Sequence, residues 1–90
     1  MNTFKLKSRP YAQCEVIYTE DGILLKSYQT IVLSLSCDGW LEVYGLYSMT
    51  TRKHISAFMR EYTDFNYYTA KECYEKNYKL NLETGEIVLK

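Results

Sequence analysis

His54 is the only histidine in the chain, and an imidazole can act as a general base toward a nearby thiol. The available nucleophiles are the three cysteines, Cys14, Cys37 and Cys73. No nucleophile signature surrounds any of them. Cys14 and Cys73 also fall at positions predicted to face inward, where cysteine behaves as a small hydrophobic residue. We therefore expect a structural or surface role for His54, name no catalytic residue, and keep a Cys/His enzyme as the least supported class.

The densest basic group contains Arg52, Lys53, His54 and Arg60, in a segment with helical periodicity. A helix that begins near Thr50 would present free backbone N–H groups, which favour an anion such as a phosphate. Basic side chains beside aromatic rings could also contact single-stranded nucleic acid. A charged helix face is more often simply solvated. The candidate binding residues are Tyr47, Ser48, Thr50, Thr51, Arg52, His54, Arg60, Tyr67 and Tyr68.

Ten tyrosines make this chain unusually aromatic for its size. Tyrosine gives a large contact area and a polar hydroxyl, and it is enriched in protein interfaces. It also suits strands and small cores, so part of the excess is structural. We expect Tyr47, Tyr67 and Tyr68 to be exposed. Residues 65–68 are predicted to form the loop between two helices, where they would make a contact patch or a cover for the core.

The sequence lacks the residue patterns that acid–base catalysis, a zinc site or a phosphate-binding loop would need. The carboxylates do not cluster, so no acid–base pair can be named. Glu20 and Asp21 lie in a predicted turn, Glu72 in a predicted helix cap, and Glu83 and Glu86 beside another turn. There is no C-x-x-C pair to suggest zinc and no glycine-rich loop to hold phosphate. We expect neither a metal nor a cofactor.

Length and composition limit the classes of protein that need considering. Ninety residues fit one domain, 1–90, and 47% hydrophobic residues with 24% charged residues are ordinary for a globular protein. Eleven basic and eleven acidic residues leave no net charge, which argues against binding nucleic acid or an anionic membrane by bulk charge. No apolar run is long enough to span a membrane, and the first residues lack a signal-peptide core. Three widely spaced cysteines favour reduced thiols in a cytoplasm.

Alternating apolar residues predict four strands, at residues 13–19, 23–26, 30–36 and 40–46. Asp21-Gly22 and Asp38-Gly39 mark tight turns between neighbouring strands. Connections this short favour an antiparallel meander. Pro10 cannot donate a ladder hydrogen bond, so residues 1–10 are expected to form an arm or an edge segment.

The apolar period then changes to that of a helix, with a stripe formed by Ile55, Phe58, Met59 and Tyr62. A hydroxyl residue among 48–51 should cap its start, and residues 63–66 should end it. Thr69 and Glu72 fit a capping box that would open a second, short helix. Its apolar face would hold Ala70, Cys73 and Tyr74, and Asn77 would end it in a left-handed conformation.

Residues 78–82 and 86–89 alternate around a glycine turn and predict a C-terminal hairpin. The whole order is four strands, two helices and a hairpin. The sequence therefore predicts an α+β domain, with an antiparallel sheet and the helices on one of its faces.

Two stretches of the sequence resemble motifs of a known group of proteins. The strand Ser27-Tyr28-Gln29-Thr30-Ile31-Val32 has the form S-Y-x-T-x-V, and residues 47–55 have the form Y-S-x-T-T-x-x-H-I. Over about residues 22–62 the chain resembles a group of small, uncharacterised proteins encoded by bacteriophages and prophages. The resemblance implies an accessory protein in the bacterial cytoplasm and assigns no catalytic residue. The matching residues are Ser27, Tyr28, Thr30, Tyr47, Ser48, Thr50, Thr51 and His54.

The sequence thus favours a small non-catalytic accessory protein of phage type. It would bind a host protein, for example to inhibit host defence, or it would bind a second copy of itself. The alternative is a module for a nucleotide or single-stranded nucleic acid, bound at the helix start between Tyr47 and His54.

Overall fold

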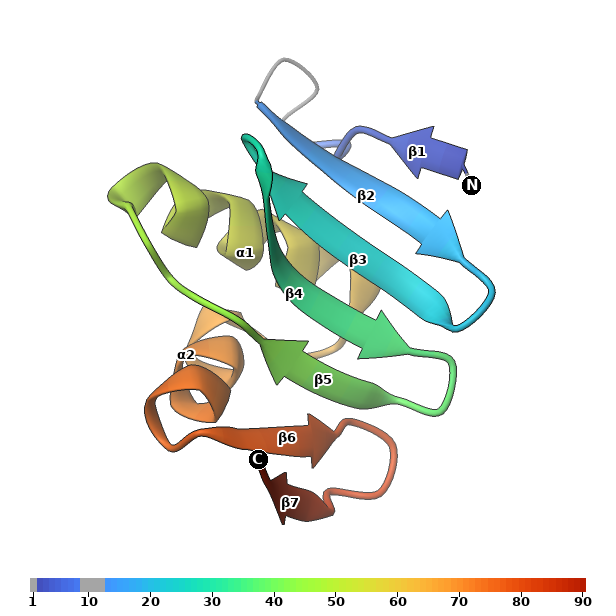
Figure 1. The fold of residues 1–90 in the computed structure, drawn as a ribbon, viewed down its shortest axis with the longest axis vertical. Coiled ribbons are helices and arrows are strands. Elements are labelled where there is room, and N and C mark those ends of the chain that lie inside the picture. Colours follow the sequence, from blue (N-terminus) through green and yellow to red (C-terminus); the bar gives the residue numbers. More distant parts are fainter. Residues whose placement is uncertain (1, 9–12) are drawn as a thin grey trace.

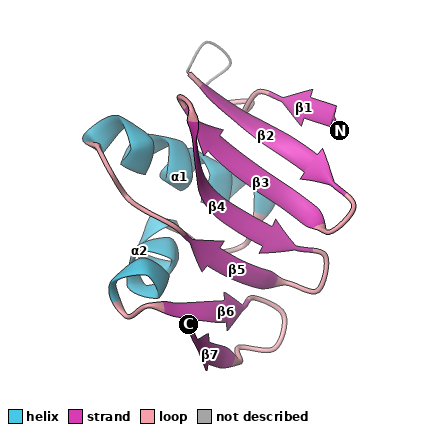
Figure 2. Ribbon diagram, viewed as in Figure 1, coloured by secondary structure: helices cyan, strands magenta, loops and turns pink. Residues whose placement is uncertain are grey.

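The computed structural model describes residues 2–8 and 13–90. Its strands form one antiparallel sheet in which the spatial order follows the chain, from β1 to β7. Both helices lie on the same side of that sheet (Figures 1 and 2). The elements are β1 (Asn2–Phe4), β2 (Cys14–Thr19), β3 (Gly22–Ser27), β4 (Thr30–Ser36), β5 (Trp40–Val43), α1 (Met49–Tyr62), α2 (Tyr67–Glu75), β6 (Tyr78–Asn81) and β7 (Ile87–Leu89). The predicted α+β class and the packing of the helices on one face are confirmed.

The core lies between the sheet and the two helices. Alternate residues of the central strands point toward the helices, as the period of a strand requires. The helices contribute the predicted stripe of α1, of which Tyr62 is only partly buried, and Ala70 and Cys73 of α2. Tyr74, predicted to lie on the apolar face of α2, is instead 43% exposed. The fully buried apolar residues include Val16, Leu25, Leu33, Leu41, Val43, Ile55, Phe58, Met59, Ala70 and Cys73.

Two predicted strand features differ from the structure. The fourth strand ends at Val43 rather than residue 46, because the chain must leave the sheet to reach the start of α1 on the helical side. In β4 the predicted alternation fails at Val32, since the pairing with β3 shifts between Leu25 and Lys26. This bulge leaves both Val32 and Leu33 fully buried.

Helix α1 begins and ends largely as predicted. Ser48 is its N-cap residue and accepts a hydrogen bond from the backbone N–H of Thr51 at 3.2 Å. At the other end, Thr63 donates both its N–H and its hydroxyl to the carbonyl of Met59, at 3.0 and 2.7 Å. These bonds satisfy backbone groups that a helix terminus leaves unpaired.

Helix α2 starts earlier than the capping box predicts. Asn66 is the N-cap residue, and its side-chain oxygen accepts from the N–H groups of Tyr68 and Thr69. Glu72 instead accepts a hydrogen bond from the hydroxyl of Tyr78 at 2.9 Å. The prediction that Tyr67 and Tyr68 lie in the inter-helix loop was therefore wrong, because they form the first turn of α2. Asn77 does adopt the expected left-handed conformation, at φ 56°.

Residues 2–8 of the N-terminal segment contact the rest of the domain through strand pairing, packing and hydrogen bonds. Strand β1 pairs with β2 at the edge of the sheet, which confirms the edge segment for residues 2–4. Leu6 is fully buried, and Glu61 of α1 accepts hydrogen bonds from the backbone N–H groups of Lys7 and Ser8, at 2.6 and 3.1 Å. Pro10, on which the prediction of an arm rested, lies outside the described residues.

Candidate functional site

The two motifs singled out in the sequence meet inside the core. The Oγ of Ser27, the last residue of β3, lies 2.8 Å from the Nδ1 of His54 in α1 and 3.1 Å from the Oγ1 of Thr51. Tyr28 follows at φ 57°, and its ring lies 5.8 Å from the imidazole of His54. This Ser27–Thr51–His54 cluster joins the turn between β3 and β4 to the first turns of α1.

A serine hydroxyl beside an imidazole has the geometry of an activated nucleophile. Here, however, Ser27 is 2% exposed and His54 is 1% exposed, so a substrate has no route to the hydroxyl in this conformation. Buried polar groups of this kind are normally satisfied by one another and fix the packing of a core. The cluster thus forms a buried polar contact between β3 and α1.

Of the other candidate binding residues, only Ser48 is bonded to this cluster. Its Oγ accepts from the backbone N–H of Thr51 as the helix cap and donates to the Oγ1 of Thr51 at 3.3 Å, so the hydroxyls of both residues are engaged. Tyr47, Thr50 and Arg52 are exposed around the first turn of the helix. Arg60 is also exposed but follows Arg52 by eight residues, which is about 12 Å along a helix.

The two aromatic candidates of α2 have different environments. Tyr68 is 70% exposed, as expected. Tyr67 is only half exposed and packs against the core, so it is less open than predicted. Its hydroxyl is buried and has no hydrogen-bond partner among the described residues.

The largest surface that sequence reasoning missed is the side of the sheet without helices, which faces the viewer in Figure 1. Cross-strand pairing places one row of side chains across all seven strands on this side. We call this surface the open face. Its row consists of Thr3, Ile17, Leu24, Ser34, Glu42, Lys79 and Val88, and the neighbouring positions add Glu15, Lys26, Ile31, Ser36, Trp40 and Tyr44.

Apolar side chains on the open face are only partly covered. Ile17, Leu24, Ile31 and Trp40 are half-buried, and Val88 is 44% exposed. In an ordinary antiparallel sheet with one solvated face, such positions are polar. The alternation of apolar residues on both sides of β2 and β3 was the signal in the sequence, because both faces of these strands carry Val, Ile or Leu.

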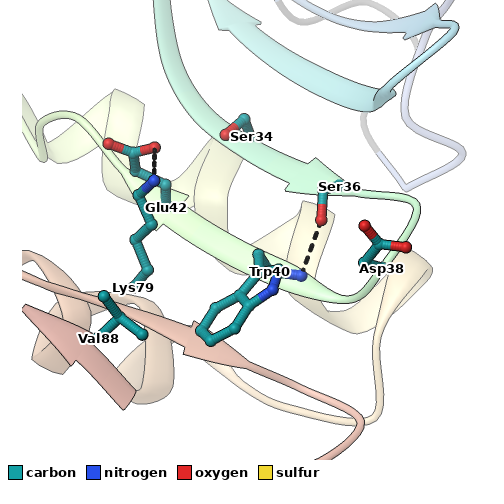
Figure 3. Close-up of a pocket in the computed structure, with 7 residues that line it drawn as sticks. All are labelled: Ser34, Ser36, Asp38, Trp40, Glu42, Lys79 and Val88. Carbon is teal, nitrogen blue, oxygen red and sulfur yellow. Dashed lines mark hydrogen bonds and ion pairs between the residues drawn. The ribbon is translucent and has the colours of Figure 1, made fainter. Parts of the chain in front are cut away.

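A shallow hollow of about 340 Å³ lies on the open face around Trp40. Figure 3 shows the ion pair of Glu42 and Lys79, at 3.9 Å, on one side of the indole and Ser36 with Asp38 on the other. The Oγ of Ser36 accepts from the backbone N–H of Trp40 at 3.0 Å. The hollow therefore offers one aromatic surface within a rim of paired charges and hydroxyls.

The charges of the open face are matched locally. Glu42 pairs with Lys79 and with Lys90, whose Nζ lies 3.7 Å from the second carboxylate oxygen. Glu15 lies directly opposite Lys26 in the pairing of β2 and β3. No strong field of one sign results from these pairs.

Among residues 2–8 and 13–90, no three His, Cys, Asp or Glu residues are grouped so that they could hold a metal ion. No helix in these ranges is long and apolar enough to cross a membrane.

Comparison with known families adds one finding. The model of a family described as a family of unknown function (DUF8033) matches residues 3–79, which is most of the chain. The chain belongs to this family. The DUF8033 match includes residues 27–32 and 47–55, the two motifs that meet at the Ser27–Thr51–His54 cluster, and it ends within β6. No curated protein and no solved structure matches the chain.

Proposed function

We propose that this DUF8033 protein is a non-catalytic accessory protein that acts by stoichiometric binding to another protein, either a host protein or a second copy of itself. The observation that carries the proposal is the open face, where Ile17, Leu24, Trp40 and Val88 leave apolar surface uncovered. Ile17 and Leu24 are direct cross-strand partners and form one apolar patch, and an exposed apolar patch on a small domain is typical of an interaction site. The burial of Ser27 and His54 further weakens the case for catalysis.

The resemblance of the two motifs to phage and prophage proteins indicates where this protein would act. We infer a product of a bacteriophage or prophage that works in the bacterial cytoplasm, with inhibition of host defence as one role that fits binding without catalysis. The odd number of cysteines and their wide spacing along the chain support a reducing compartment.

Affinity capture from bacterial lysate tests the proposal when it is done with matched variants. Leu24→Lys places a charge in the centre of the open face, and Tyr74→Lys places the same charge at an exposed position of α2 that is not a candidate binding residue. We expect the wild type and Tyr74→Lys to retain the same stoichiometric protein, or the same self-assembly, and Leu24→Lys to lose it. A protein that is monomeric and retains no specific partner contradicts the proposal.

The alternative function is binding of a nucleotide or a short single strand at the start of α1. It is favoured by the exposure of Tyr47, Thr50 and Arg52 around one helix terminus, where backbone N–H groups attract anions. It is weakened because the hydroxyls of Ser48 and Thr51 are already engaged. Salt-sensitive binding of a nucleotide that Arg52→Ala abolishes would support this alternative, and binding that Arg52→Ala leaves unchanged would exclude this position.

A further inference from the structure

The open face spans all seven strands of the sheet. Figure 1 views the molecule along its shortest axis and onto this face, and the whole molecule, helices included, measures 34 × 28 Å across this view. An ellipse with these axes covers about 750 Å², close to the 800 Å² or so that each partner buries in a standard interface. This area is an upper limit for the face, so a standard interface would use nearly all of it.

The charges of the face limit the kind of partner. Its acidic residues Glu15, Asp38 and Glu42 are balanced by its basic residues Lys26, Lys79 and Lys90. A nucleic acid or an anionic membrane needs a surplus of basic residues, which this face lacks. A second copy of the same neutral face would not be repelled, and a two-fold axis would let acidic residues of one copy meet basic residues of the other.

The apolar residues have the arrangement that packing of two sheets uses. Ile17 and Leu24 are direct cross-strand partners, so their side chains form one continuous ridge on β2 and β3. The hollow around Trp40 lies on the same face across β4 and β5. Sheets that pack face to face interdigitate such ridges and hollows.

From size, charge and shape together, and resting on the proposed function, we propose that the partner is a second copy of this chain. The two copies associate through their open faces about a two-fold axis. The product is a four-layer dimer with the sheets in the middle and the helices outside. The edge strands are poorer candidates, because β1 and β7 have only three residues each and offer few backbone hydrogen bonds.

Trp40 makes the proposal directly measurable, since it is the only tryptophan and lies on the open face. The experiment combines light scattering after size exclusion with tryptophan fluorescence over a dilution series of the full chain. We expect twice the monomer mass of 10.7 kDa at high concentration, and an emission maximum that shifts to the red as the dimer dissociates on dilution. Leu24→Lys should weaken the dimer by about tenfold or more, because it buries an unpaired charge. Tyr74→Lys on α2 should leave the dimer unchanged.

Circular dichroism controls for folding, and Ile17→Thr provides a second variant that keeps strand propensity while removing apolar surface. A monomer at all concentrations overturns the proposal. So does a dimer that persists in both open-face variants and is lost in Leu89→Lys, which would indicate pairing of edge strands. If the chain is monomeric but Leu24→Lys abolishes capture of another protein, self-association fails while the proposed binding function stands.

Discussion

The Oγ of Ser27 lies 2.8 Å from the Nδ1 of His54, although the two residues are 27 positions apart in the chain. This hydrogen bond connects the end of β3 to the second turn of α1 inside the core. It gives the helix a fixed position along the strands that apolar contacts alone would not define, since such contacts have no preferred direction.

Removing the serine hydroxyl should destabilise the protein. Ser27→Ala leaves His54 Nδ1 and the Thr51 hydroxyl without this partner, and we expect the free energy of unfolding to fall by about 1–3 kcal/mol. Urea denaturation followed by circular dichroism measures the change. Ser34→Ala is the matched control, because its hydroxyl bonds to Tyr44 at the surface, and it should cost less than about 0.5 kcal/mol. Equal losses for the two variants would contradict the role of the cluster.

Two tyrosines should ionise late in an alkaline titration. Burial raises the pKa of Tyr78 to about 12, helped by the hydrogen bond to Glu72, and burial with the neighbouring Tyr18 raises the pKa of Tyr62 to about 12. Both values exceed the ordinary value of 10, so the stabilisation is complete below pH 10 and is lost as the pH rises toward 12.

The absorbance of tyrosinate measures this titration. We expect a late phase in the wild type that coincides with alkaline unfolding and corresponds to two tyrosines. Tyr78→Phe should reduce the late phase by about half, because only Tyr62 then remains. A late phase of unchanged size would show that Tyr78 is not held in this way.

The three thiols should differ in reactivity. Cys37 is exposed in the turn between β4 and β5, whereas Cys14 and Cys73 are buried. Burial also raises the pKa of the Cys73 thiol to about 11, which lowers the fraction of reactive thiolate. A thiol reagent should modify one cysteine rapidly in the native protein and the other two only on unfolding. Cys37→Ser should remove the rapid phase, and a rapid phase that survives would place another thiol at the surface.

Acid should loosen the N-terminal segment. Partial burial raises the pKa of Glu61, but hydrogen bonds from Ser8 and Lys7 outweigh it and hold the pKa below its usual 4.5. The stabilisation is therefore present above pH 4.5 and is lost as the pH falls through the lower, folded value. Because Glu61 is only partly buried and solvent screens its interactions, we expect a contribution under about 1 kcal/mol.

Amide hydrogen exchange at Lys7 and Ser8 measures the effect locally. Glu61→Gln should increase exchange at both amides at neutral pH, while Glu75→Gln, on exposed α2, should not. Exchange that is equally slow in Glu61→Gln would show that the carboxylate does not hold this segment.

Much of the fold could be predicted because local patterns decide it. The Asp-Gly turns at Gly22 and Gly39 have the positive φ that the dipeptide predicts, and the stripe of α1 is buried as its period requires. The prediction failed where two local signals competed. Asn66 and Thr69 are both good cap residues, and the structure uses Asn66 while Glu72 bonds to Tyr78.

The candidate site was harder to predict from the sequence than the fold, because it depends on contacts between distant parts of the chain. The hydrogen bond of Ser27 to His54 and the row of the open face depend on pairings between distant strands and helices, which no local period reports. Ile17 and Leu24 are plainly apolar in the sequence. Only the position of the helices shows which of the apolar sets on β2 and β3 is covered and which is left open.

The strictly sequential strand order has a consequence for the speed of folding. Every pairing from β1 to β5, and that of β6 with β7, joins neighbours along the chain, so each closes a short loop at low entropic cost. The exception is the pairing of β5 with β6, which brings Trp40 next to Asn81. The chain between these two strands contains both helices. We expect this closure to be the slow step, after a meander of β1–β5 has formed, since non-local contacts limit folding rates. Changes in β6 should then slow folding, whereas changes in β1 should mainly speed unfolding.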